Sequence, residues 1–126
     1  MFQFIYIIDS DASYIDLLVK TFNKIDSNVG CVTSINSEEA LNTLSDIIAA
    51  PAIILLNINI IKADRGLCLR TIKTLFSGIA VVVYSPYVSI EYQKITEELG
   101  ATFYIFNPYQ SIEVNKFANL ILENIK

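Results

Sequence analysis

Five short apolar runs alternate along the chain with five amphipathic segments, and this alternation limits the folds that the chain can adopt. The runs are short and apolar, as strands of a parallel sheet are; they span residues 4–8, 31–35, 52–56, 79–84 and 103–106. The first, which is β-branched and aromatic, is predicted to be a strand buried on both faces. The other segments repeat apolar residues every three or four positions, as helices with one buried face do; they span residues 15–25, 37–48, 67–76, 88–99 and 114–125. The pattern predicts one α/β domain over residues 1–126, a doubly wound five-stranded parallel sheet with helices on both faces.

Polar and turn residues bound these elements. Asp11 or Ser13 is expected to cap the helix over residues 15–25, and Ser37 is expected to cap the next helix. That helix has its last apolar positions at Ile47 and Ile48, before Pro51 breaks it. Residues 57–66 are predicted to form a loop.

Composition excludes several classes of protein. Hydrophobic residues make up 53% of the 126 residues and charged residues 17%, whereas a disordered chain has low hydrophobicity and high charge. The longest apolar run, residues 47–56, is half the length that a membrane span needs. The net charge of −4, with no long basic run, argues against direct binding of nucleic acid. The apolar stretch that ends at Asp9 lacks the basic start of a signal peptide, so a cytoplasmic protein is expected.

The chain contains no histidine and two cysteines. The absence of histidine excludes Ser-His-Asp and Cys-His hydrolysis, most zinc sites and any imidazole base. Cys31 and Cys68 lie 37 residues apart, which is not a metal-binding spacing. They are predicted to be reduced thiols in or near the core.

Polar residues stand where four of the predicted strands end. In parallel sheets, functional loops gather at the carboxyl ends of the strands. Those ends carry Asp9-Ser10-Asp11, Asn57, Ser85 and Asn107. Any chemistry of the domain is expected to converge on these side chains.

Five segments, in order, resemble the receiver domain of bacterial two-component response regulators, and the resemblance covers essentially the whole chain. They are the acidic end of the first strand, the start of the second helix, and the ends of the third, fourth and fifth strands, at residues 7–11, 37–41, 54–59, 82–85 and 104–109. The resemblance implies a flavodoxin-like (βα)5 fold with strand order 2-1-3-4-5. It also implies a role in phosphorelay signal transduction.

The sequence departs from the family pattern at the positions that carry its chemistry. In the family, an aspartate carboxylate at the end of the third strand attacks phosphorus and becomes an acyl phosphate. Asn57 stands there, and a carboxamide is a very poor nucleophile. Asn107 replaces the family lysine that pairs with the phosphoryl oxygens. Of the acidic pair that holds Mg²⁺ in the family, Asp9 is kept, Ser10 replaces the second acid, and Asp11 lies one residue out of register.

The resemblance therefore implies a vestigial acidic pocket. Its members are Asp9, Ser10, Asp11 and Asn59, beside Asn57. Mg²⁺ favours an octahedral shell of carboxylate and water oxygens. Because two of the three family carboxylates are missing, Mg²⁺ binding is expected to be weak or absent. No cofactor and no enzymatic activity are expected.

Two further positions match residues that couple phosphorylation to the outer face of the family's domain. They are Ser85, whose hydroxyl would follow the phosphoryl group, and Tyr104, whose ring would turn inward. Ordinary packing of a strand tyrosine and turn chemistry before a proline are the alternative explanation. The Asn107–Pro108 bond corresponds to a cis peptide in the family and is predicted to be cis here.

These observations favour a degenerate receiver, or pseudo-receiver, that is not phosphorylated and acts by protein–protein interaction. Its partner is expected to be a separate protein or the chain's own output module, such as a transcription module, if residues 1–126 are the N-terminal part of a longer regulator. The family's usual partner face comprises the segments 88–99, 103–106 and 114–125. Its expected exposed members are Tyr87, Tyr92, Lys94, Glu98, Tyr109 and Lys116, and the same face is the expected site of homodimerisation.

Two other functions are compatible with the sequence. One is a receiver that still responds to a phosphodonor or to a metal ion in an altered way. The other is a small-molecule sensor that uses the emptied pocket near Asp9, Asn57 and Asn107.

Overall fold

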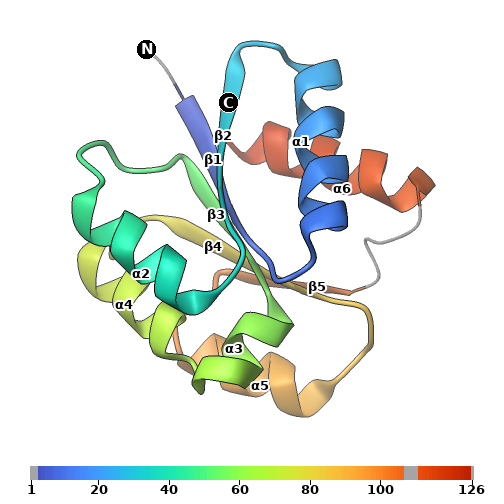
Figure 1. Ribbon diagram of the computed structural model, residues 1–126. Coiled ribbons are helices and arrows are strands. Elements are labelled where there is room, and N and C mark those ends of the chain that lie inside the picture. Colours follow the sequence, from blue (N-terminus) through green and yellow to red (C-terminus); the bar gives the residue numbers. More distant parts are fainter. Residues whose placement is uncertain (1–2, 107–110, 126) are drawn as a thin grey trace.

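The computed structural model describes residues 3–106 and 111–125, and in them five parallel strands form one sheet (Figure 1). The strands are β1 (Gln3–Ile8), β2 (Val29–Ser34), β3 (Ile53–Asn57), β4 (Ala80–Ser85) and β5 (Phe103–Phe106). Their order in the sheet is β2-β1-β3-β4-β5. The predicted flavodoxin-like architecture and strand order are therefore confirmed.

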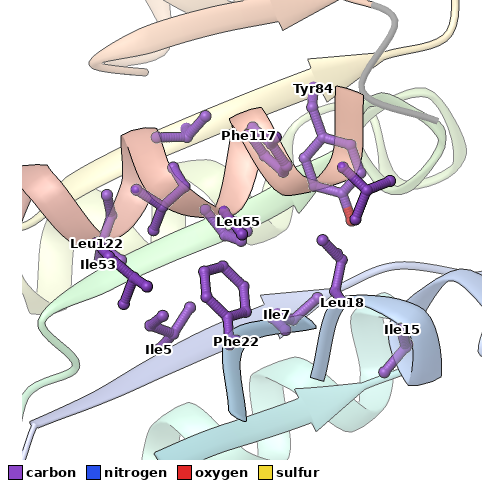
Figure 2. Packing of buried hydrophobic residues seen from close by; sticks show 14 of the residues in the cluster. Ile5, Ile7, Ile15, Leu18, Phe22, Ile53, Leu55, Tyr84, Phe117 and Leu122 are labelled. Carbon is purple, nitrogen blue, oxygen red and sulfur yellow. The ribbon is translucent and has the colours of Figure 1, made fainter. Parts of the chain in front are cut away.

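Helices cover both faces of this sheet. They are α1 (Ala12–Ile25), α2 (Ser37–Asp46), α3 (Ile58–Asp64), α4 (Leu67–Leu75), α5 (Ile90–Glu98) and α6 (Ser111–Asn124). Figure 1 shows α1 and α6 on one side of the sheet and α2, α3 and α4 on the other. Strand side chains alternate between the faces: Ile5 and Ile7 pack against α1 and α6, whereas Tyr6 and Ile8 pack against α2 and α4. Figure 2 shows the first of these two cores.

The prediction of a loop over residues 57–66 is wrong, because the described chain has a sixth helix there, α3. The side chain of Asn57 caps this helix, and three apolar side chains behind it are buried: Ile58, Ile60 and Ile61. Arg65 and Gly66 then adopt left-handed backbone angles, with φ of 56° and 82°, and separate α3 from α4. A Cβ on Gly66 would lie 2.6 Å from Leu99 Cδ1, so glycine suits both the conformation and the close approach.

The predicted bounds of α2 also need correction. Asn36, and not Ser37, is the N-cap, since its side chain accepts a hydrogen bond from the backbone N–H of Glu39. The Ser37 hydroxyl instead donates to Asp64 Oδ2 at 2.7 Å and so ties α2 to the end of α3. The helix ends at Asp46, which leaves Ile48 outside it and fully exposed. For α1, the sequence left Asp11 and Ser13 as the two candidate caps, and Asp11 is the cap.

Replacing Asn36 with alanine is expected to lower the free energy of unfolding by about 1 kcal/mol, since alanine cannot satisfy the orphan N–H groups of the first turn. Asn42→Ala is the matched control, because Asn42 is exposed within α2 and should change stability by less than about 0.5 kcal/mol. Urea denaturation of both variants measures the difference. Equal stabilities of the two variants would contradict the capping role of Asn36.

Both cysteines are free thiols, as predicted; Cys31 is half-buried and Cys68 is buried. Burial, with the negative charge of Asp64 nearby, raises the pKa of the Cys68 thiol to about 12. The Cys68 thiol therefore stays protonated at neutral pH and behaves as a small apolar side chain. No helix in the described part of the chain has the length and apolar character needed to cross a membrane.

Candidate functional site

The Asp9 carboxylate lies at the carboxyl end of β1 and is almost completely buried, with 1% of its surface exposed. One oxygen, Oδ1, accepts a hydrogen bond from the backbone N–H of Asp11 at 2.9 Å. The other, Oδ2, accepts one from the Tyr84 hydroxyl at 2.5 Å. The side chain of Asn57 also hydrogen-bonds the carboxylate. Both oxygens of this buried acid are thus satisfied by donors of the protein itself.

Strand register brings these groups together. Ile8 pairs with Leu56 and Asn57 pairs with Tyr84, so the ends of β1, β3 and β4 lie side by side. Residues two apart in a strand lie on the same face of a sheet, so Asn57 shares the face of Leu55. The side chains of Leu55 and Tyr84 lie on the face that α1 and α6 cover. The site is therefore built on three adjacent central strands of the sheet.

Tyr84 is the site residue that sequence reasoning missed. Its side chain is fully buried, with ring centroids 5.9 Å from Tyr14 of α1 and 5.6 Å from Phe117 of α6. Figure 2 shows Tyr84 beside Phe117 at one end of this core. A tyrosine in an otherwise aliphatic strand is a signal that could have found it, because a buried hydroxyl needs a hydrogen-bond partner.

The environment of Asp9 raises the pKa of its carboxyl above the ordinary value of 3.8. Burial is the main cause, because it disfavours the charged form, and the negative charge of Asp11 acts in the same direction. Hydrogen bonds from Tyr84, the Asp11 N–H and Asn57 oppose the rise by stabilising the carboxylate. The Tyr84 hydroxyl is the strongest of these three opposing groups.

Asn57, at the position of the family's phosphoacceptor, is 2% exposed. Its Oδ1 accepts a hydrogen bond from the backbone N–H of Asn59 at 2.8 Å and caps α3, while its side chain also bonds Asp9. Asn59 itself is exposed in the first turn of α3. The structure therefore joins Asn57 to Asp9 as predicted and gives the amide two structural contacts.

The remaining acidic-pocket residues do not converge on a metal site. Ser10 is exposed, and Asp11 Oδ1 accepts from the Tyr14 N–H at 3.1 Å, which caps α1. Proteins usually hold Mg²⁺ through one or two carboxylates together with water, and both oxygens of Asp9 already accept hydrogen bonds from protein N–H or O–H groups. Among residues 3–106 and 111–125, no group of three acidic, cysteine or histidine side chains could hold a metal ion. These residues do not fit Mg²⁺.

The two switch-equivalent residues are both engaged in local packing. Ser85 is buried, and its hydroxyl donates to the Tyr87 carbonyl at 3.0 Å and accepts from the Tyr87 N–H at 3.2 Å. These bonds are the turn chemistry that the sequence offers as an alternative explanation. The Tyr104 ring packs against the α2–α4 core, and its hydroxyl is buried without a partner in the described part of the chain. Asn107, Pro108 and Tyr109, including the predicted cis bond, lie outside the described residues.

Residues predicted for a partner face differ in exposure. Lys94 and Glu98 of α5 and Lys116 of α6 are exposed, and Lys116 lies 3.9 Å from Glu113 in an exposed ion pair. Tyr87 is exposed and Tyr92 is half-buried. The ammonium group of Lys62, which sequence reasoning did not single out, lies 4.7 Å from the Tyr87 ring centroid and 4.6 Å from that of Tyr92. These cation–π contacts join α3 to the start of α5.

Comparison with protein-family models found no match, and comparison with curated proteins found none either. Solved structures of response regulators do resemble the chain. The phosphorylated cyanobacterial phytochrome response regulator RcpA is 22% identical, with a TM-score of 0.85 over 98% of this chain and 93% of its own. A CheY-like receiver domain from Methanospirillum hungatei is 17% identical, with a TM-score of 0.79 over 99% of this chain and 97% of its own.

A third similar structure is that of a longer protein. NtrX from Brucella abortus is 24% identical, with a TM-score of 0.74 over 99% of this chain but only 27% of its own. At these identities the likeness concerns architecture. The chain has the fold of response regulator receiver domains.

Proposed function

We propose that the chain is a receiver-like signalling domain that is not phosphorylated and acts by binding another protein. One observation carries this proposal: the Asp9 carboxylate and the Asn57 amide are held by hydrogen bonds within the protein. The side chains at the positions that bind a metal ion and accept a phosphoryl group in a typical receiver are thus already hydrogen-bonded within this protein.

Chemical reasoning supports the same proposal. An acyl phosphate requires a carboxylate nucleophile, which residue 57 does not supply. Residue 107 is an asparagine and brings no positive charge to pair with phosphoryl oxygens. The domain is accordingly proposed to have no enzymatic activity and no cofactor.

The proposed partner is a separate protein or an output module attached to this domain in a bacterial cytoplasmic regulator. The match to about a quarter of NtrX is consistent with an attached module. Exposed apolar side chains lie near the charged residues of α5, and groups of such side chains mark interaction surfaces. They include Val88 just before α5, Ile90 in α5 and Phe106 in β5. Homodimerisation through α5, β5 and α6 is the second arrangement that this face would support.

Intact mass spectrometry tests the absence of phosphorylation. The protein is incubated with Mg²⁺ and acetyl phosphate, beside a receiver domain that has the phosphoacceptor aspartate. We expect the control to gain the mass of one phosphoryl group and this protein to keep its mass. A gain that maps to residue 57 would overturn the proposal and favour a receiver with altered chemistry.

A further inference from the structure

A cavity of about 160 Å³ lies between β5 and α6. Apolar side chains supply most of its lining: Ile53, Val82, Phe103, Ile105, Leu120 and Ile121. Tyr104 and Asn124 also line it, and the Asn124 amide donates a hydrogen bond to the Leu120 carbonyl within α6. A polar ligand would lose its hydration here with few groups to replace it, so the lining selects an apolar ligand.

The cavity is separate from the Asp9 site. Ile53 is the first residue of β3 and Phe103 the first of β5, whereas Asp9 follows the carboxyl end of β1. Both features lie on the α1–α6 face of the sheet but at opposite ends of the strands. A ligand in this cavity therefore would not depend on the acidic pocket, although it would occupy part of the β5–α6 surface that the proposed function assigns to a partner.

Exposure of the lining residues gives the cavity a route to solvent. Phe103 is 48% exposed and Leu120 is 45% exposed, while Ile53, Val82 and Ile121 are each 1% exposed. The cavity thus has an accessible mouth at the sheet edge formed by β5 and a buried floor beneath α6. A void sealed inside the core would lack such an entrance.

The volume limits the size of the ligand. An enclosed apolar cavity of about 150 Å³ engineered in another protein binds benzene, so a volume of about 160 Å³ is large enough for one such ring. A ring of matching size would displace water from this apolar lining and make dispersion contacts with it. We propose that the cavity between β5 and α6 binds a small apolar molecule with the dimensions of one six-membered ring.

Methyl-labelled NMR with benzene as the probe tests this assignment. In the wild-type protein, benzene is expected to shift the methyl resonances of Ile53, Val82, Ile105 and Ile121 in a saturable manner and to raise the melting temperature. The methyl groups of Ile8 and Leu44, on the opposite face, should not move.

Two substitutions make the test specific. Leu120→Trp places a large ring at the mouth, and Ile121→Phe adds volume at the floor; each is expected to weaken benzene binding at least tenfold. Leu17→Trp is the matched control, because Leu17 is 39% exposed on α1 and does not line the cavity. It should bind benzene as the wild type does. Absence of saturable shifts in the wild type, or unchanged binding in both filled variants, would overturn the proposal.

Discussion

Replacing Tyr84 with phenylalanine is expected to lower the free energy of unfolding by about 1.5–3 kcal/mol at neutral pH, the usual range for a hydrogen bond to a charged group. The Tyr84 hydroxyl donates to the buried carboxylate of Asp9, and phenylalanine keeps the ring between Tyr14 and Phe117. The variant therefore removes the donor with little change in packing. Urea denaturation of the two proteins measures the loss.

The loss should also depend on pH. The pKa of Asp9 is higher in the folded protein than in the unfolded chain, so protonation of Asp9 favours the folded state. This contribution to the free energy of unfolding is fully present below the unfolded pKa and is lost as the pH rises through the folded pKa. Without the Tyr84 donor the folded pKa rises further, so Tyr84→Phe should be least destabilising at acid pH, where Asp9 is protonated. Stability curves from neutral pH down to about pH 4 test this sign.

Tyr6→Phe is the matched control for this experiment. The Tyr6 hydroxyl is also buried, but it bonds the neutral Ser34 hydroxyl at 2.6 Å. Because both partners are neutral, Tyr6→Phe is expected to lower the free energy of unfolding by about 0.5–1.5 kcal/mol, and this loss should not change over the same pH range. Equal losses for the two variants at every pH would show that Tyr84 does not stabilise a charge on Asp9.

Replacing Asn57 with aspartate is expected to destabilise the protein by about 3 kcal/mol at neutral pH, the range for a buried charge left without compensation. The substitution sets a second carboxylate beside Asp9 and removes the amide that bonds it. Since neighbouring like charges raise each other's pKa, the loss should shrink as the pH falls. Urea denaturation at neutral and at acid pH measures both effects.

Asn57→Asp should also remain poorly phosphorylated, although it restores the nucleophile. Residues 10 and 107 still lack the metal-binding acid and the cation of the family, because Ser10 and Asn107 stand there. For the stability measurement, Asn59→Asp is the control, since Asn59 is exposed in the first turn of α3 and its replacement should change the free energy of unfolding by less than about 0.5 kcal/mol. Efficient labelling of Asn57→Asp by acetyl phosphate and Mg²⁺ would show that the losses at residues 10 and 107 matter little.

The sheet could be predicted because the central strands β1, β3 and β4 are nearly continuous apolar runs, as buried parallel strands are. The helix α3 was missed for a physical reason. Its residues Ile58, Ile60 and Ile61 directly continue the apolar run of β3, and the boundary is set by the Asn57 side chain turning to cap the next N–H groups. Asparagine after a strand is equally typical of a loop, so the local pattern could not separate the two structures.

The site was predicted in part. Asp9 and Asn57 follow strands that a parallel sheet places side by side, so their proximity could be inferred from the sequence. The bond from Tyr84 to Asp9 joins residues 75 positions apart and depends on strand register. The contacts of Lys62 with Tyr87 and Tyr92 depend on a helix that was expected to be a loop. Register and tertiary contacts, rather than residue types, were the missing information.

The most direct measurement of the central claim is an amide NMR titration of the wild-type protein with millimolar Mg²⁺, followed by beryllofluoride as a phosphoryl analogue. Because the side chains of Asp9 and Asn57 are already hydrogen-bonded within the protein, we expect the amide resonances of Asp11, Asn59 and Tyr87 to stay unchanged at both steps. Saturable shifts of these resonances with Mg²⁺, or further shifts with beryllofluoride, would contradict the claim that the site has lost the receiver chemistry.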